Sequence, residues 1–189
     1  MENNVFERAL SFAYEAHKGQ KRKDGGIYFL HPMEVACIIG SITQDEDVIA
    51  AGLLHDTVED TPVTADEILA EFGPRIAALV ACETEDKRPE MPPAESWRIR
   101  KEESLVFLRD CEDPGAKILW LGDKLSNIRA ISRDYDRMGD EVFVRFNQKD
   151  KAAQKWYFES VLALLSDLAD TEAYREFAAH IRKVFGGNE

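Results

Sequence analysis

The six residues His55–Asp60, with the sequence HDTVED, constrain this chain more than any other stretch, because four of them can bind a metal or move a proton. They follow an apolar run, 48–54, whose spacing is helical rather than alternating. On a helix, His55 and Glu59 lie on one face, and so do Asp56 and Asp60. Three carboxylates gathered at the end of a buried helix repel one another, and that arrangement is costly without a cation. The stretch therefore predicts a metal site.

Helical spacing of apolar residues continues through almost all of the chain. A helix from about residue 45 enters HDTVED, and the other predicted helices cover 5–16, 32–39, 64–72, 75–83, 95–111, 118–128, 156–168 and 171–185. Residues 113–115 predict a turn, and 134–148 are ambiguous, so the role of the segment 134–150 stays open. No pair of strands with a hairpin signal and no internal repeat is visible. We expect an all-α helical bundle in which residues 1–189 form one domain, with a core over about 5–165 and a C-terminal helix over about 171–185.

Charge and composition narrow the classes of function. The chain has 189 residues, is 44% hydrophobic and carries a formal net charge of −12. A core can therefore form, and a protein that binds nucleic acid through a basic face is disfavoured. One basic cluster, 18–23, can still bind a small polyanion, although such a cluster taken alone is more typical of a solvated loop.

The cysteines and the hydropathy pattern indicate a cytoplasmic protein. Cys37, Cys82 and Cys111 are widely spaced and odd in number, which fits neither a disulfide framework nor a zinc site. The N-terminus lacks a basic and apolar leader, and the longest apolar runs are too short to span a membrane. We expect no membrane association, and the oligomeric state is not fixed by the sequence.

Two further segments contribute ligand-type side chains. The sequence YFLHP over 28–32 places His31 where a loop meets a helix N-terminus. The segment 119–127 places Asp123 inside an otherwise apolar helix, where a buried acid needs a partner. Lys124 is the simplest partner, but as the next residue on a helix it is expected to point elsewhere.

Together, His31, His55, Asp56 and Asp123 offer two nitrogen and two oxygen ligands. Such a set suits Mn²⁺, Fe²⁺ or Co²⁺ and lacks the thiolates of a structural zinc site. Four protein ligands leave positions on an octahedral ion for water and a substrate oxygen, so that the ion can polarise a phosphoryl group.

Other polar and aromatic residues have simpler explanations. His17 and His180 are expected to be structural or surface residues, and the tryptophans are expected to pack in the core. Glu85 and Asp86 precede a proline-rich stretch, which favours a solvated acidic loop over a second metal site.

The order of these motifs resembles the HD superfamily of metal-dependent phosphohydrolases. More specifically, it is similar to the hydrolase domain of the RelA/SpoT alarmone enzymes and to the stand-alone small alarmone hydrolases. The resemblance spans about residues 5–165 and is carried by five segments, AHKGQKRK at 16–23, YFLHP at 28–32, HDTVED at 55–60, TEDK at 84–87 and GDKLSNIR at 122–129.

This resemblance implies an enzyme of the stringent response that cleaves ppGpp or pppGpp at the ribose 3′ ester, releasing pyrophosphate and GDP or GTP. It implies that His31, His55, Asp56 and Asp123 bind the metal, with Mn²⁺ favoured over Fe²⁺, Co²⁺ or Mg²⁺. Glu59 and Asp60 would activate or orient the attacking water. The implied nucleotide contacts are Arg22, Lys23, Asn127 and Tyr157. A chain of this length has no room for a synthetase domain, so we expect degradation only.

Two other functions remain open. An HD phosphohydrolase acting on another nucleotide, such as a deoxynucleoside monophosphate or NADPH, would share the metal site but would not require the basic residues Arg22 and Lys23. A non-catalytic nucleotide-binding module is disfavoured, because every expected ligand and catalytic acid is present.

Overall fold

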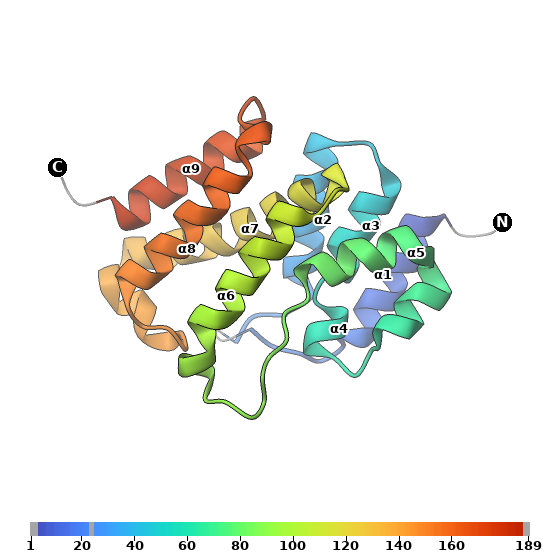
Figure 1. Cartoon of the computed structure of the whole chain (residues 1–189), viewed down its shortest axis with the longest axis horizontal. Coiled ribbons are helices and arrows are strands. Elements are labelled where there is room, and N and C mark those ends of the chain that lie inside the picture. The colour runs from blue at the N-terminus through green and yellow to red at the C-terminus, as the bar shows by residue number, and fades with distance from the viewer. Residues whose placement is uncertain (1–3, 23–24, 187–189) are drawn as a thin grey trace.

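The computed structural model describes residues 4–22 and 25–186, and within them the chain is helical, with one isolated bridge between Lys21 and Ile27. The elements, drawn in Figure 1, are α1 (Val5–Ala16), α2 (Leu30–Ile42), α3 (Glu46–Leu54), α4 (Thr57–Asp60), α5 (Ala65–Glu83), α6 (Pro93–Asp110), α7 (Pro114–Met138), the 3₁₀ helix η1 (Gly139–Arg145), α8 (Lys151–Leu164), the 3₁₀ helix η2 (Ser166–Leu168) and α9 (Glu172–Phe185). The prediction of an all-α fold is confirmed.

Local sequence explains most helix boundaries. Thr64 and Glu67 form a reciprocal capping box at the start of α5. Gly73 has a φ of 84°, which favours glycine, and it kinks α5 where the sequence predicted two separate helices. The turn predicted at 113–115 was wrong. Asp113 is instead the N-cap of α7 and Pro114 its first residue, because proline suits the first helical turn.

The ambiguous segment after residue 134 continues α7 to Met138 and then forms η1. The predicted helix 156–168 in fact begins earlier, at Lys151, and its last residues form η2. Val142 and Phe143 of η1 are buried in the C-terminal part of the core, which holds this segment against α7. It therefore packs as part of the fold.

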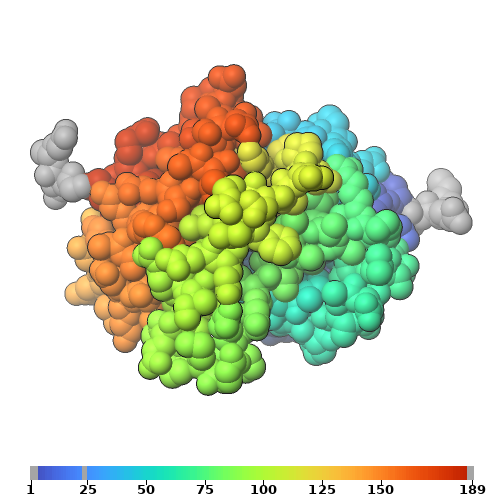
Figure 2. Space-filling model, viewed as in Figure 1, coloured from blue at the N-terminus to red at the C-terminus, as the bar shows by residue number. Residues whose placement is uncertain are grey.

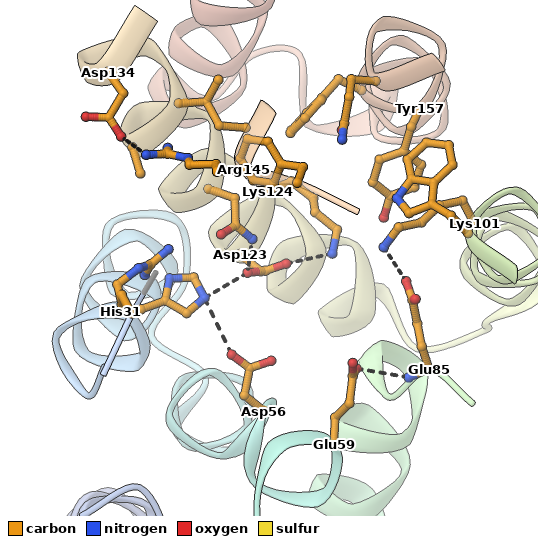
Figure 3. Close-up of a pocket in the computed structure, with 18 of the residues that line it drawn as sticks. His31, Asp56, Glu59, Glu85, Lys101, Asp123, Lys124, Asp134, Arg145 and Tyr157 are labelled. Carbon is orange, nitrogen blue, oxygen red and sulfur yellow. Dashed lines mark hydrogen bonds and ion pairs between the residues drawn. The ribbon is translucent and has the colours of Figure 1, made fainter. Parts of the chain in front are cut away.

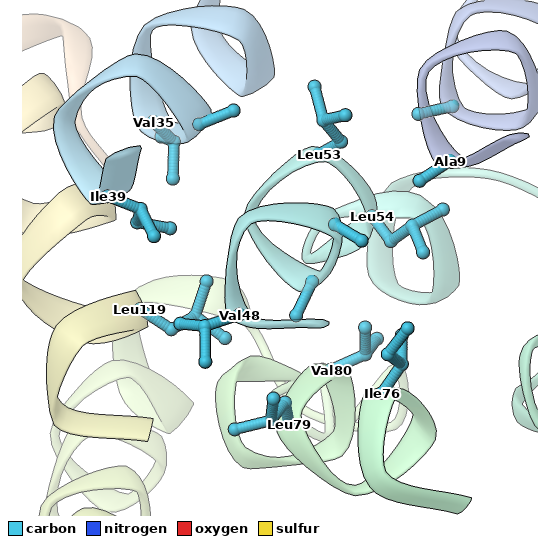
Figure 4. Packing of buried hydrophobic residues seen from close by; sticks show 14 of the residues in the cluster. Ala9, Val35, Ile39, Val48, Leu53, Leu54, Ile76, Leu79, Val80 and Leu119 are labelled. Atoms are coloured by element: carbon cyan, nitrogen blue, oxygen red, sulfur yellow. The ribbon is translucent and has the colours of Figure 1, made fainter. Parts of the chain in front are cut away.

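Two hydrophobic clusters share helix α7. The first lies among α1, α2, α3 and α5, with α3 in its middle (Figure 4). The second joins α6, α7, α8 and α9 and includes Trp120, Phe158 and Phe177. In the space-filling view, α6 and the segment before it lie over the middle of the molecule (Figure 2). The first turns of α7 pack in the first cluster and the remainder in the second, so α7 ties the two together.

Glycines allow α2, α3 and α7 to approach closely. A Cβ atom added at Gly52 of α3 would lie 2.5 Å from Ile39 Cδ1, and one at Gly122 of α7 would lie 2.9 Å from Ile39 Cγ1. Gly52 is three residues before His55, and Gly122 adjoins Asp123. Two close helix contacts therefore lie directly beside predicted ligands.

No helix within residues 4–22 and 25–186 is both long and apolar enough to cross a bilayer.

Candidate active site

The four predicted ligands meet where α2, α7 and the link between α3 and α4 come together. His31 Nε2 lies 3.0 Å from Asp123 Oδ1 and 3.6 Å from Asp56 Oδ2. His55 Nε2 lies 3.1 Å from Asp56 Oδ2 and 3.6 Å from Asp123 Oδ1. Ligand atoms of His31, His55 and Asp123 all lie within 4.8 Å of one another, and all three residues are buried. Figure 3 shows His31, Asp56 and Asp123 converging on one point.

A break in the helix makes His55 and Asp56 converge. The sequence predicted one helix running into HDTVED, but α3 ends at Leu54 and α4 begins at Thr57. Asp56 has φ −90° and ψ −5°, away from the regular helical values. Consecutive side chains of a regular helix point about 100° apart. The irregular link lets these two neighbours face the same centre.

Hydrogen bonds on the outer ring nitrogens orient both imidazoles. His55 Nδ1 lies 2.9 Å from the carbonyl oxygen of Gly52, which can only accept, so Nδ1 carries a proton. The Ser126 hydroxyl donates its single proton to Glu34 Oε2 at 2.8 Å. The same hydroxyl lies 2.8 Å from His31 Nδ1 and therefore accepts a hydrogen bond from it. Both histidines thus present Nε2 to the carboxylates.

This donor set fits a divalent cation. Nε2 of His55 is buried and has no hydrogen-bond partner within the described residues. Without a metal, burial lowers the pKa of His55, but the Asp56 and Asp123 carboxylates outweigh burial and hold that pKa well above its usual value. The centre therefore attracts positive charge, and two imidazoles with two carboxylates match the ligand preferences of Mn²⁺, Fe²⁺ and Co²⁺.

Lys124 corrects one expectation from the sequence. Its ammonium does not point away from Asp123 but lies 2.6 Å from Asp123 Oδ2 and 3.1 Å from Glu83 Oε2. The flexible four-carbon stem lets the ammonium reach the neighbouring acid, and buried Glu83 on α5 provides a second carboxylate for it. Lys124 therefore donates to Oδ2 of Asp123, while Oδ1 of Asp123 faces the two histidines.

Glu59 and Asp60 lie in different surroundings. Glu59 lines the cavity beside the predicted metal ligands. Burial raises the pKa of Glu59 to about 7, opposed by a hydrogen bond from the Glu85 backbone and assisted by the Asp56 carboxylate. Asp60 is not among the residues that line the cavity. It accepts hydrogen bonds from Tyr28 Oη at 2.8 Å and from Lys87 Nζ at 2.5 Å.

Tyr28 connects Asp60 to the predicted metal ligand Asp56, because its hydroxyl also lies 2.5 Å from Asp56 Oδ2. The Tyr28 ring packs against His17, with 4.8 Å between ring centroids. The structural role expected for His17 fits this contact. His180 lies elsewhere, on α9, with its Nε2 3.4 Å from Glu176 Oε1.

A cavity of about 600 Å³ opens from the ligand cluster and extends along α7 (Figure 3). Three of the predicted nucleotide contacts, Arg22, Asn127 and Tyr157, line it, and Lys23 lies outside the described residues. Lys21 of the basic cluster also lines the cavity, whereas Lys18 pairs with Glu15. Part of that cluster therefore faces the cavity.

Glu85 corrects a second expectation. It is not solvated, because its side chain is 9% exposed and pairs with Arg100 at 2.7 Å and Lys101 at 2.5 Å. Arg100 and Lys101 of α6 both line the cavity, and Figure 3 shows Lys101 on the side opposite His31. Neither residue could be singled out from the sequence, because charged residues recur along the whole of α6.

Comparison with known proteins identifies the family to which this fold belongs. The family model described as an HD domain matches residues 9–153. The chain belongs to the HD domain family. HD hydrolases are metal-dependent, in agreement with the His and Asp cluster described above. The resemblance indicated by HDTVED and its partner motifs is thus confirmed.

Three relatives illustrate the likeness. The guanosine-3′,5′-bis(diphosphate) 3′-pyrophosphohydrolase of Aquifex aeolicus is 38% identical over 125 residues, which cover 66% of this chain and 17% of that protein. A structure described as a metazoan ortholog of SpoT that hydrolyzes ppGpp and plays a role in starvation responses matches with a TM-score of 0.73 and 25% identity, over 97% of both chains. A Listeria monocytogenes EGD-e crystal structure matches with a TM-score of 0.71 and 31% identity, over 84% of this chain and 95% of the other.

Proposed function

We propose that this chain is a metal-dependent hydrolase that removes pyrophosphate from the 3′ position of ppGpp or pppGpp and releases GDP or GTP. The observation that carries the proposal is one cavity lined by three of the four proposed metal ligands, by an acid with a raised pKa and by many basic side chains. The names of the Aquifex and metazoan relatives support this substrate. Residues 1–189 act as a single HD domain in this proposal.

His31, His55, Asp56 and Asp123 would hold the ion, and we propose Mn²⁺, with Fe²⁺, Co²⁺ and Mg²⁺ as alternatives. A divalent cation at this position supplies a Lewis acid for a phosphoryl oxygen and lowers the pKa of water. His55 and His31 donate from their outer ring nitrogens to Gly52 and Ser126, which supports their ligand roles because such contacts fix the orientation of ligating imidazoles.

Glu59 would accept the proton of the water that attacks the phosphorus of the 3′ ester, while the bond from that phosphorus to the ribose 3′ oxygen breaks. A pKa near 7 suits a base that works at neutral pH. Asp60 would assist by holding Tyr28 and Lys87 beside Asp56 and Glu59.

Arg22, Lys23, Asn127 and Tyr157 would contact the nucleotide. Arg22 can stack on a guanine face or pair with a phosphate. Asn127 lies one helical turn from Asp123 and donates to its Oδ1 at 2.7 Å, which puts it beside the reacting group. The hydroxyl of Tyr157 is buried and has no hydrogen-bond partner within the described residues, and a substrate oxygen would supply one.

The test is to incubate Mn²⁺-loaded protein separately with ppGpp, a deoxynucleoside monophosphate and NADPH, and to resolve orthophosphate from pyrophosphate. We expect pyrophosphate and GDP from ppGpp. If either competitor releases orthophosphate while ppGpp stays intact, the substrate is another nucleotide and not ppGpp. No turnover of any of the three would contradict the hydrolase proposal.

A further inference from the structure

Basic side chains are concentrated in the cavity although the protein as a whole is acidic. Eight lysine and arginine residues line it against six aspartate and glutamate residues, in a chain with a net charge of −12. Most of these acids lie at or near the metal cluster. The remaining one, Asp134, lies farther along α7 among three arginines that also line the cavity, Arg133, Arg137 and Arg145.

Asp134 anchors two of these arginines. Its side chain is 9% exposed and forms ion pairs with Arg137, one turn later on α7, and with Arg145 at the end of η1. The chain between them turns back at Gly139, whose φ of 58° favours glycine. This turn brings Arg145 back against α7, where Figure 3 shows it beside Asp134 on the cavity side.

The charges in this group do not cancel. Arg137 and Arg145 share the one negative charge of Asp134, and Arg133 has no ion-pair or hydrogen-bond partner within the described residues. Two positive charges are therefore left over at this end of the cavity. Planar guanidinium groups bind phosphate oxygens with two parallel hydrogen bonds, so such an excess suits a phosphate or diphosphate group.

The spacing along α7 suits a nucleotide that carries phosphates at both ends. Arg133 lies ten residues after Asp123, or ~15 Å along the helix axis. Side chains on a helix lean toward its N-terminus, so Arg133 and Arg137 lean toward Asp123. An arginine side chain is longer than that of Asp123 and reaches farther in this direction, which shortens the gap between the arginines and 3′ phosphates held at the proposed metal ligands.

We propose that Arg133, with Arg145 and Arg137 held by Asp134, binds the 5′-diphosphate of the substrate and so selects nucleotides phosphorylated on both sides of the ribose. This inference rests on the proposed function, because it assumes that the 3′ phosphates lie at the end of the cavity formed by His31, Asp56 and Asp123, the metal end. It names a second phosphate site in the same cavity.

The first test compares Arg133→Ala with Arg182→Ala, which removes the same charge from an exposed position on α9 away from the cavity. Each variant is assayed with ppGpp and with guanosine 3′-diphosphate, which lacks the 5′ phosphates. We expect Arg133→Ala to lose about tenfold or more in kcat/KM for ppGpp, as for a charge-assisted contact, and little for the shorter nucleotide. Equal losses for both nucleotides, or no loss, would overturn the proposal, and Arg182→Ala should match the parent.

A second variant, Arg145→Lys, keeps a cation opposite Asp134 but removes the two-pronged guanidinium. We expect it to remain folded and to lose selectivity for ppGpp over guanosine 3′-diphosphate, because lysine is a point charge. If neither Arg145→Lys nor Arg133→Ala changes this selectivity, the arginine site is excluded.

A binding measurement tests the proposed phosphate site independently of hydrolysis. Calorimetry on Mn²⁺-loaded Glu59→Gln measures the affinities for ppGpp and guanosine 3′-diphosphate without relying on turnover. We expect the 5′-diphosphate to improve affinity, and we expect Arg133→Ala added to this background to abolish most of the improvement. If the parent protein cleaves neither nucleotide but this binding pattern holds, the phosphate site stands and the proposed reaction fails. Equal affinities for both nucleotides would overturn the site.

Discussion

The side chains at the two ends of the cavity differ in their exposure to solvent and in how firmly neighbouring groups fix them. At the metal end, His31, His55 and Asp123 are 2–4% exposed, and each has a neighbouring group that fixes its orientation. At the basic end, Arg133 is exposed and the side chain of Arg137 is 73% exposed. Buried charges interact strongly and are costly to move, whereas exposed charges are screened by salt. Under the proposed function, the metal end would hold its groups fixed for the chemistry, and the basic end would bind the substrate reversibly.

The largest effect is expected at the metal end. Asp56→Ala removes one of two oxygen ligands and should abolish tight metal binding, lowering turnover by about 10³-fold or more because metal activation of water is lost. Metal content after dialysis and pyrophosphate release measure the two effects. Asp47→Ala, which removes an exposed acid on α3, should change neither. Full metal content in Asp56→Ala would refute its ligand role.

Glu59→Gln separates chemistry from metal binding. The variant should keep its metal but lose about 10²–10⁴-fold in kcat, the range of general base catalysis. The pKa of Glu59 is raised to about 7, and only the deprotonated form accepts a proton, so the parent rate should rise as pH increases toward 7. Glu59→Gln should remove this dependence. Parent-like activity in the variant would exclude a role as base.

Ser126→Ala probes how far the metal end depends on oriented histidines. Losing the hydroxyl that accepts from His31 Nδ1 should weaken metal affinity by about 10–100-fold, as for other contacts to ligating imidazoles. Ser132→Ala is the matched control, since Ser132 is buried on the same helix and its hydroxyl has no partner within the described residues. Metal titration compares them, and similar affinities in both variants would contradict the orienting role.

Gly122→Ala tests the close packing of α2 and α7 beside Asp123. The added methyl would lie 2.9 Å from Ile39 Cγ1, and overpacking of this kind costs about 1–3 kcal/mol in the free energy of unfolding. At Gly40 the nearest atom would be 4.0 Å away, so Gly40→Ala should be neutral or stabilising. Denaturant unfolding of both variants measures the difference. Equal stability would show that α7 moves freely against α2.

The smallest effect concerns the basic end. Raising the salt concentration from about 50 mM to about 300 mM should increase KM for ppGpp several-fold with little change in kcat, because salt screens exposed arginines more than buried ligands. Arg133→Ala should flatten this dependence. A fall in kcat at constant KM would instead place the salt-sensitive step at the metal end.

Local patterns allowed most of the helices to be predicted and the four candidate ligands to be chosen. Apolar spacing and capping residues act over one or two helical turns, so α1, α3 and α5 could be recognised from neighbours in sequence. The expectations for the side chains of Lys124 and Glu85 were wrong for the opposite reason. Lys124 contacts Glu83 of α5 as well as the adjacent Asp123, and Glu85 pairs with Lys101 of α6, and no local pattern records which helices will meet.

The sequence by itself determined which atoms are available for chemistry, namely two imidazoles, two carboxylates and Glu59, in segments that match the HD domain family. Only the tertiary structure decided that they converge. Gly52 and Gly122 let α3 and α7 pack against Ile39, and the break after Leu54 turns His55 and Asp56 toward the same point. It also decided that Arg145 returns to Asp134 across the Gly139 turn. Such contacts depend on packing between distant segments, which side-chain spacing along one helix does not specify.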